Sequence, residues 1–331
     1  MPYTEIFVKI KSLIESHNRF ILLSHVHTDG DALGSLIGLR HYLNSIGKKV
    51  SIFVPGDIPQ KYAFLDTANL VNQGDADQQE KYISDAEVIF ILDISSLKRL
   101  DKYYEPVKKS AAQKVLIDHH PAQQDWTQIA LVDTGRIATA EMIYALLKFL
   151  KAEITIEIAQ ALYTAILSDS GSFRFFNTGS DTFHMAAELV EKGTEPAEMF
   201  SRVFETARAG QLRAWGNLLS DLQRSDSCSW IEVSLEFMRK HKLELHEIDG
   251  LMDIMRRDNG AEAFVIFVEK ERDEILVGLR SKEKVDVGQV ARDFGGGGHF
   301  HASGYTSTKN LSVTVKQTLQ VLKNNVKKVN I

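Results

Sequence analysis

Histidine and aspartate side chains crowd a short segment near the start of the chain, HVHTDGD at residues 25–31. His25, Asp29 and Asp31 could each offer a ligand atom to a metal ion, and the segment follows an apolar run that begins at Phe20. Carboxylates and imidazoles without a thiolate suit Mn²⁺, Mg²⁺ or Fe²⁺ better than a structural zinc. Taken alone, TDGD could be a turn, and Asp31 could be the N-cap of the helix that follows.

Further acidic and histidine residues stand where other predicted elements end. Asp93 follows VIFIL, the triplet Asp118-His119-His120 follows KVLI, and Asp169 lies at the end of a predicted helix in ILSDSGSF. In open α/β sheets, ligand sites form outside the carboxyl ends of the strands. We therefore expect these segments to converge with residues 25–31 on one crevice.

The expected crevice holds the carboxylates of Asp29, Asp31, Asp93 and Asp169. Packed together, they would repel one another strongly unless cations lay between them. Two divalent ions about 3.5–4 Å apart would offset that charge and generate a hydroxide near neutral pH. The pattern therefore favours a two-metal cage, whereas nothing in it directs the neighbouring His27 inward.

The segments that carry these side chains alternate between strand and helix patterns. Short apolar runs predict strands at residues 20–25, 48–55, 87–95 and 113–121, and the first of them suits a strand buried on both faces. Apolar residues at helical spacing predict helices near the N-terminus, between Asp31 and Gly47, and at 139–151 and 156–168. Strands that alternate with helices predict an α/β fold with a doubly wound, mainly parallel sheet.

The pattern changes after about residue 185. We expect residues 1–190 to form the metal-binding catalytic domain and residues 191–225 a helical linker. Residues 226–331 are expected to form a second, smaller α/β domain. Its predicted elements are strands at 229–234, 261–270 and 273–281, a helix at 286–294 and a helix at the C-terminal end.

The second segment that could bind a ligand is a glycine run at 295–298, and His299 follows it directly. Backbone N–H groups that no side chain covers can cradle an anion. Arg280 ends a predicted strand, where a guanidinium can clamp a phosphate through two hydrogen bonds. The run lacks the Lys-Ser/Thr pair of a P-loop. Alternatively, the glycines form a flexible loop and Arg280 is a surface charge.

Composition limits the class of protein. The 331 residues carry a formal net charge of −5, which argues against a protein that coats nucleic acid but not against a pocket for one short anionic ligand. Cys228 is the single cysteine, so no internal disulfide can form and a reducing compartment is expected. We find no signal peptide and no membrane span in the sequence, and we expect a cytoplasmic protein.

The ordered motifs resemble those of the DHH phosphoesterase superfamily, which takes its name from the triplet seen here as Asp118-His119-His120. HVHTDGDALGS is similar to the first motif of that family, LDIS to the second and SDSGSFRF to the fourth. GLRSK followed by GGGGHFHASG resembles the C-terminal DHHA1 domain. The resemblance covers nearly the whole chain. It implies a DHH catalytic domain and a DHHA1 substrate-binding domain.

The resemblance also implies roles for single residues. His25, Asp29 and Asp93 would hold one metal ion, while Asp31, Asp93, His119 and Asp169 would hold the other, with Asp93 bridging. His120 would face the substrate as an acid or orienting donor. The substrate-binding residues would be Arg280, Ser281, Gly296, Gly297, Gly298 and His299. Mn²⁺ is the first expectation for both ions, with Mg²⁺, Co²⁺ or Fe²⁺ as alternatives.

The activity implied is the hydrolysis of short RNA or DNA oligonucleotides and of the small nucleotide pAp by metal-activated water. A cyclic-dinucleotide or pApA phosphodiesterase would use the same cage. A family II inorganic pyrophosphatase would share the first domain but have a different C-terminal domain, without GGGGH. A non-catalytic nucleotide sensor would lack part of the ligand set, which is complete here. A homodimer is left open.

Overall fold

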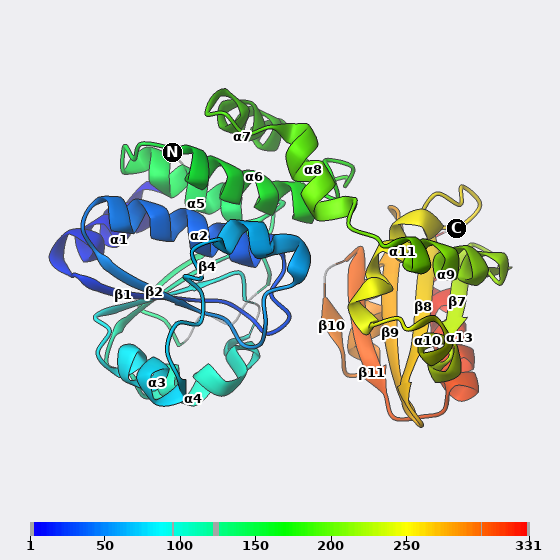
Figure 1. Cartoon of the computed structure of the whole chain (residues 1–331). Helices are drawn as coiled ribbons and strands as arrows, with labels where there is room; N and C mark the ends of the chain where they lie inside the picture. Colours follow the sequence, from blue (N-terminus) through cyan, green and yellow to red (C-terminus); the bar gives the residue numbers. More distant parts are fainter. Residues whose placement is uncertain (1–2, 95, 122–125, 299, 330–331) are drawn as a thin grey trace. The chain divides into compact units, whose positions relative to one another are not determined.

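The computed structural model describes residues 3–94, 96–121, 126–298 and 300–329. The chain folds into two compact units, Met1–Thr206 and Ala207–Ile331 (Figure 1). The finer division expected from the sequence, with a linker over 191–225, stays a prediction. No helix in the described part of the chain is long and apolar enough to cross a membrane.

A five-stranded sheet forms the centre of the first unit, in the order β2-β1-β3-β4-β5. Every pairing between these strands is parallel. The strands are β1 (Arg19–Leu23), β2 (Lys49–Phe53), β3 (Val88–Leu92), β4 (Gln113–Asp118) and β5 (Ile129–Val132). The predicted α/β fold with a parallel sheet is confirmed, and the short edge strand β5 is the one that the pattern analysis missed.

Helices cover both faces of this sheet (Figure 1). One face carries α1 (Thr4–Ser16), α2 (Gly30–Ser45), α5 (Thr139–Phe149) and α6 (Ile156–Asp169). The other carries α3 (Ala76–Ser84) and α4 (Tyr104–Lys109), with the 3-10 helix η2 (Leu97–Tyr103) just before α4. Consecutive residues of β1 enter different cores, Leu22 that of the α2 face and Leu23 that of the other. This two-sided burial explains why the strands are continuous apolar runs.

The strand order places a topological switch point between β1 and β3. The chain continues from β1 to β2 on one side, and β3 pairs with β1 on the other. In open parallel sheets of this order, the loops that leave the two central strands diverge and open a crevice at their carboxyl ends. His25 follows β1 and Asp93 follows β3, so both lie at this crevice.

Further helices of the first unit pack against α2, α5 or α6. The 3-10 helix η1 (Gln60–Asp66) contacts α2, and α8 (Pro196–Phe204) contacts both η1 and α6. Between them in sequence, α7 (Ser180–Glu191) packs against α5 and α6. The apolar residues Met199 and Val203 of α8 complete the core on the α2 face.

The second unit is built on a six-stranded mixed sheet, in the order β10-β11-β9-β8-β7-β6. Its strands are β6 (Gln223–Ser225), β7 (Cys228–Val233), β8 (Ala263–Glu271), β9 (Glu274–Ser281), β10 (Gly297–Gly298) and β11 (Ala302–Ser307). Its helices are α9 (Ala209–Ser220), α10 (Leu235–His241), α11 (Asp249–Met255), α12 (Val287–Asp293) and α13 (Leu311–Val329). The sheet separates two apolar cores, since Val265 belongs to one and Ile266 to the other.

Candidate metal centre

The loop between β1 and α2 carries the first group of candidate ligands. Asp29 is the N-cap of α2, because its Oδ1 accepts a hydrogen bond from Ala32 N at 3.0 Å. The alternative reading of Asp31 as this N-cap is therefore wrong. His25 is buried, and its Nε2 lies 3.7 Å from Asp29 Oδ2. His27 is exposed, and it belongs to none of the candidate clusters among the described residues.

Asp31 has a different structural partner. Its side chain is fully buried, and its two carboxylate oxygens accept hydrogen bonds from Thr139 N at 2.6 Å and Ala140 N at 3.0 Å. These are the first N–H groups of α5, which have no acceptor inside their own helix. Ser35 Oγ donates a third hydrogen bond at 3.2 Å. The N-terminus of α5 therefore holds Asp31 in place at the crevice.

Asp93 lies at the centre of the cluster, directly after β3. Its φ of 55° lies in the left-handed region, which aspartate tolerates better than most residues. Its amide donates to Ile117 O at 3.0 Å, which continues the pairing with β4. On the carboxylate, Oδ2 lies 3.3 Å from His25 Nε2, and Oδ1 lies 3.4 Å from His119 Nε2.

The triplet that ends β4 contributes two imidazoles and their support. Asp118 Oδ1 accepts hydrogen bonds from His120 N at 3.0 Å and from His120 Nδ1 at 2.8 Å. His119 Nδ1 lies 3.2 Å from Arg136 O, which leaves Nε2 directed at Asp93 and Asp169. Residues in a strand would send their side chains to opposite sides. Here β4 has ended at Asp118, and both rings face Asp93 with centroids 4.5 Å apart.

The described residues form three groups whose ligand atoms lie within 4.8 Å of one another. These groups are His25, Asp29 and Asp93; Asp31, His119 and Asp169; and Asp93, His119 and His120. The structure thus brings together every histidine and aspartate that was expected at the crevice. Carboxylates and imidazoles at this spacing form a donor set that suits a divalent ion of the Mn²⁺ or Mg²⁺ type.

The carboxylates of the cluster repel one another, and this repulsion raises the pKa values of two of them. The pKa of Asp31 is well above its ordinary value, because the group is buried and the charges of Asp93 and Asp169 oppose its ionisation. Burial and repulsion from Asp29 raise the pKa of Asp169 to about 6. Burial also opposes ionisation of Asp93, but hydrogen bonds from the surrounding histidines hold its pKa well below the usual range. A divalent cation would relieve this repulsion.

The histidines of the cluster bind protons tightly when no metal competes. Burial alone would lower the pKa of His119, but hydrogen bonds to Asp169 and Asp93 raise it well above its ordinary value. Burial is likewise outweighed at His120, where hydrogen bonds to Asp118 and Asp93 raise the pKa to about 10. Imidazoles coordinate metals only when the ligating nitrogen is deprotonated, so metal binding here must displace protons.

The candidate substrate residues of the second unit lie on adjoining strands. Arg280 of β9 pairs with Ala302 of β11, and Gly298 of β10 pairs with Ser303 of β11. Ser281 is fully buried, and its Oγ lies 2.9 Å from His301 Nδ1. His299, the last residue of the predicted anion cradle, lies outside the described residues.

The glycines of this run differ in why the fold needs them. A Cβ atom on Gly296 would lie 2.3 Å from Gly304 O, so the packing against β11 excludes any side chain there. A Cβ atom on Gly297 would meet no protein atom within 4 Å, and its φ is not in the left-handed region. The described residues therefore do not require glycine at position 297.

Pattern analysis missed Thr139, which supports two of the candidate ligands. Its backbone N–H binds Asp31, and its Oγ1 donates to Asp93 Oδ1 at 3.3 Å. Thr139 is the first residue of a predicted helix. The N–H groups in the first turn of a helix have no acceptor within that helix, and this position is the signal in the sequence that could have pointed to Thr139. His301 was missed as well, because nothing in HFHASG marks it as the partner of Ser281.

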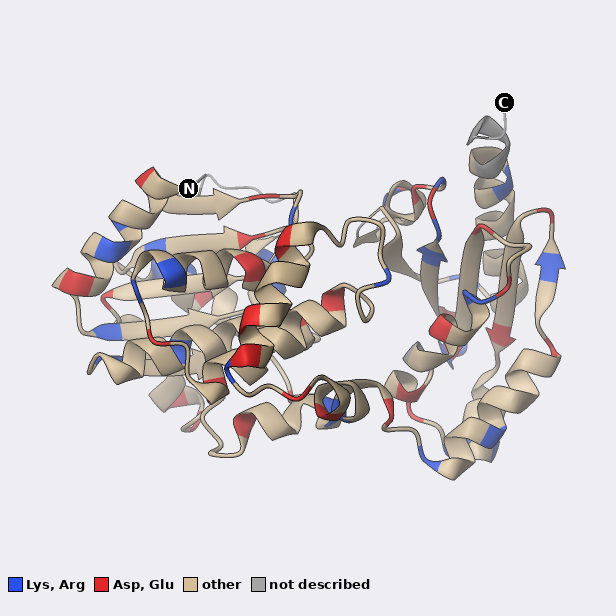
Figure 2. Ribbon diagram, turned by 90° about the horizontal axis from the view of Figure 1, so that it is seen from above, with Lys and Arg blue, Asp and Glu red and all other residues tan. Residues whose placement is uncertain are grey.

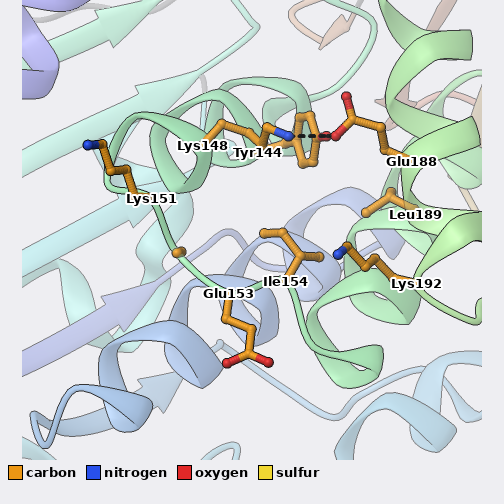
Figure 3. A pocket seen from close by; sticks show the side chains of 9 residues that line it. Tyr144, Lys148, Lys151, Glu153, Ile154, Glu188, Leu189 and Lys192 are labelled. Atoms are coloured by element: carbon orange, nitrogen blue, oxygen red, sulfur yellow. Dashed lines mark hydrogen bonds and ion pairs between the residues drawn. The ribbon is translucent and has the colours of Figure 1, made fainter.

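A separate pocket of about 260 Å³ lies beside α5 and α7 (Figure 3). Lys148 and Glu188 form an ion pair across it at 2.6 Å, and Tyr144 also donates a hydrogen bond to Glu188. Lys151 and Lys192 line it too, but none of its lining residues belongs to the metal-ligand groups. We assign it no part in the chemistry of the cluster.

Comparison with known proteins now identifies the family. The DHH family N-terminal domain matches residues 19–166, and the DHHA1 domain matches residues 232–328. A Thermus thermophilus protein named bifunctional oligoribonuclease and PAP phosphatase NrnA is 30% identical over 285 residues, which cover 86% of this chain and 83% of that protein. The chain belongs to the DHH/DHHA1 phosphoesterase superfamily.

Other DHH proteins agree with this placement. The Bacillus subtilis protein of the same name is 29% identical over 297 residues, which cover 88% of this chain and 90% of that protein. An exopolyphosphatase-related protein from Bacteroides fragilis has a crystal structure that superposes with a TM-score of 0.93 at 26% identity, covering 99% of this chain and 98% of that chain. RecJ from Thermus thermophilus in complex with Mn²⁺ shares the fold, with a TM-score of 0.51 at 11% identity over 98% of this chain and 54% of that chain.

Proposed function

We propose that this protein is a metal-dependent phosphoesterase that hydrolyses short oligonucleotides and pAp. The observation that carries the proposal is the convergence of four buried or half-buried carboxylates and three imidazoles at the β1/β3 switch point, with ligand atoms within 4.8 Å in each group. The names of the Bacillus and Thermus relatives, which state oligoribonuclease and PAP phosphatase activity, support the substrate class.

The proposed metal ligands follow the clusters. His25, Asp29 and Asp93 would hold one ion, and Asp31, His119 and Asp169 would hold the other. Asp93 Oδ1 lies 3.4 Å from His119 Nε2, so Asp93 would join the second set and serve both ions. We propose Mn²⁺ as the ion, with Mg²⁺, Co²⁺ or Fe²⁺ as alternatives. A bound pair of divalent ions would supply an activated water and would neutralise charge on the phosphoryl group.

The chain's own residues prepare the site for that chemistry. The carbonyl of Arg136 accepts from His119 Nδ1 and so keeps Nε2 available as the ligating atom. Asp118 anchors His120 through its backbone and its ring. We assign His120 the role of acid or orienting donor to the leaving group, because the same hydrogen bond to Asp118 favours its protonated form.

We propose that the second unit binds the nucleotide. Arg280 would contact a terminal phosphate or base, and the exposed Gly297 and Gly298 would bring their backbone against the same ligand, with Gly296, Ser281 and His299 beside it. The N–H of Gly296 already donates to Ala291 O at 2.8 Å, so it is not one of the proposed donors. The match of residues 232–328 to the DHHA1 domain counts against a family II pyrophosphatase, which was expected to have a different C-terminal domain. The domain division, a cytoplasmic location and a homodimer are also proposals.

A substrate panel tests the proposal. The purified protein is incubated with pAp, RNA dimers to pentamers, pApA, cyclic di-AMP and pyrophosphate, each with Mn²⁺ and with EDTA. We expect Mn²⁺-dependent hydrolysis of pAp and the short RNAs and no hydrolysis with EDTA. Preference for cyclic di-AMP or pApA would establish the rival phosphodiesterase activity. Metal binding without hydrolysis of any substrate would support a nucleotide sensor.

A further inference from the structure

An arginine that the sequence analysis did not select lies against the metal cluster. Arg99 belongs to η2, on the opposite face of the sheet from α2. Its guanidinium Nη2 lies 3.1 Å from His25 Nδ1, on the side of the ring away from Asp93. Its carbonyl accepts a hydrogen bond from Val26 N at 2.8 Å. The loop that presents His25 is thus tied to Arg99 through both backbone and side chain.

The two contacts of His25 Nδ1 require that nitrogen to be protonated in one case and unprotonated in the other. Val26 O, at 2.7 Å from Nδ1, can only accept a hydrogen bond, whereas the Arg99 guanidinium can only donate one. A ring that uses Nε2 as a metal ligand carries its proton on Nδ1 and donates it to Val26 O. In that form, Nδ1 of His25 cannot accept a hydrogen bond from Arg99. The N–H groups of the guanidinium are then available to another acceptor.

No carboxylate among the described residues supplies that other acceptor. The ion pairs of the cluster are all made by histidines, and Arg99 has no ion pair with any described residue. Arg99 is half-buried, so part of the residue remains exposed to solvent. A cation held beside a dense group of carboxylates, yet paired with none of them, suits an incoming anion.

We infer that Arg99 binds phosphate in the catalytic unit. Its guanidinium would donate a hydrogen bond to a non-bridging oxygen of the phosphoryl group under attack. This inference rests on the proposed phosphoesterase function and adds a residue to it. A planar guanidinium presents paired donors that match phosphate oxygens, and charge-assisted contacts of this kind are strong. Because the contact is to the reacting group itself, Arg99 should act on every phosphate substrate, whatever its nucleoside.

The test compares Arg99→Met and Arg99→Lys with the control Lys98→Met. Lys98 is the exposed neighbour on η2, so its replacement removes the same charge without reaching His25. For each Mn²⁺-loaded protein, the metal content is measured by elemental analysis and the affinity for inorganic phosphate by calorimetry. Hydrolysis of bis-p-nitrophenyl phosphate and of pAp is measured in parallel.

We expect Arg99→Met to keep its metal content and to bind inorganic phosphate about ten- to a hundredfold more weakly, with kcat/KM lowered similarly for both substrates. Arg99→Lys should recover part of the phosphate affinity, because it keeps the charge but not the planar fork. Lys98→Met should behave as the wild type. Unchanged phosphate affinity in Arg99→Met would overturn the inference. So would loss of Mn²⁺ from both Arg99 variants, since it would show that Arg99 only positions His25.

The phosphate measurement separates this inference from the proposed function. If the wild-type protein hydrolyses nothing in the substrate panel but Arg99→Met still loses phosphate affinity, the function fails and the phosphate site stands. If the wild type hydrolyses nucleotides and Arg99→Met retains both phosphate affinity and turnover, the phosphate site fails and the function stands.

Discussion

Asp93 combines an unusual backbone conformation with the most connected carboxylate of the cluster. Its φ of 55° places the carboxylate between histidines that come from the ends of β1 and β4. Asp31 and Asp169 are held nearby but take part in fewer of the candidate groups. Among the carboxylates, Asp93 is therefore the candidate to serve both metal sites.

Asp93→Asn should empty both sites while leaving the fold intact. Asparagine also tolerates the left-handed region, so the backbone strain stays the same, but the neutral amide cannot bridge two cations. We expect Mn²⁺ content after dialysis to fall toward zero and turnover to disappear with it. Asp57→Asn, at an exposed aspartate, is the control. Retention of two Mn²⁺ equivalents by Asp93→Asn would show that Asp93 is not the bridging ligand.

The raised pKa of His120 predicts how the metal-free protein responds to pH. Its pKa is about 10 in the folded chain, against an ordinary value of 6.5. The folded state therefore binds this proton more tightly, so the stabilisation is complete below about pH 6.5 and is lost as pH rises toward 10. In EDTA, we expect the free energy of unfolding by urea to decrease across this window.

His120→Gln supplies the comparison for the pH experiment. It removes the titrating ring, so its unfolding free energy should decline less between pH 6.5 and pH 10 than that of the wild type. Parallel declines in the two proteins would assign the pH dependence to other groups. Saturating Mn²⁺ should reverse the trend near neutrality, because metal binding requires deprotonated histidines.

At the scale of single elements, the N-terminus of α5 is the main support for the cluster. Its first N–H groups bind Asp31, and the Thr139 hydroxyl binds Asp93. The helix therefore contacts two of the proposed ligands without supplying one itself. Supporting residues of this kind set the orientation of ligands and hence the metal affinity.

Thr139→Val should weaken metal binding without unfolding α5. Valine has the same shape and keeps the backbone N–H, so only the hydrogen bond to Asp93 is lost. We expect Mn²⁺ affinity, measured by calorimetry, to fall about tenfold. Thr164→Val on α6 is the matched control, since Thr164 is also buried but its hydroxyl donates to Gln160 O in its own helix. Equal losses of affinity in both variants would mean that the effect comes from general repacking.

Neighbouring glycines of β10 and the turn before it should respond differently to the same substitution. Gly296→Ala forces a Cβ against Gly304 O, so the melting temperature should fall, in line with a cost of about 1–3 kcal/mol for overpacking. The Cβ atom of Gly297→Ala would meet no protein atom within 4 Å, so this variant should have the melting temperature of the wild type. If a ligand approaches this backbone, Gly297→Ala should still raise KM for pAp. An unchanged KM would exclude close contact between Gly297 and the substrate.

At the scale of the whole molecule, chemistry and nucleotide recognition are proposed for different units. The metal-ligand groups lie entirely within Met1–Thr206, whereas Arg280 and the glycine run lie within Ala207–Ile331. In the view of Figure 2, basic and acidic residues are interspersed over the helices and strands of both units. With a net charge of −5, this distribution suits short anionic substrates better than long polynucleotides.

Arg280→Ala should therefore alter substrate selection more than catalysis. Loss of a charge-assisted contact worth about 1.5–3 kcal/mol should raise KM for pAp and RNA dimers about ten- to a hundredfold. Hydrolysis of bis-p-nitrophenyl phosphate, which has no nucleoside, should change far less. Arg272→Ala, at an exposed arginine in the turn between β8 and β9, is the control. Equal loss on both substrates would place Arg280 in the chemistry or in folding.

The sequence alone determined the features that depend on local patterns. Apolar runs of strand length and apolar residues at helical spacing identified β1, β3, β4, α5 and α6, because burial on both faces and helical periodicity leave direct marks in the chain. The same patterns showed that His25, Asp93 and His119 follow strands. Since parallel strands end at one edge of a sheet, their convergence could be expected without coordinates.

Only the tertiary structure decided how those residues are held. Asp31 binds the N-terminus of α5 rather than capping α2, and its hydrogen bonds join segments more than a hundred residues apart. Arg99 reaches His25 from a 3-10 helix that has no distinctive pattern. The pairing of β10 with β11 decides which glycine can bear a side chain. Such contacts depend on which segments become neighbours after folding, and local sequence carries no direct record of that.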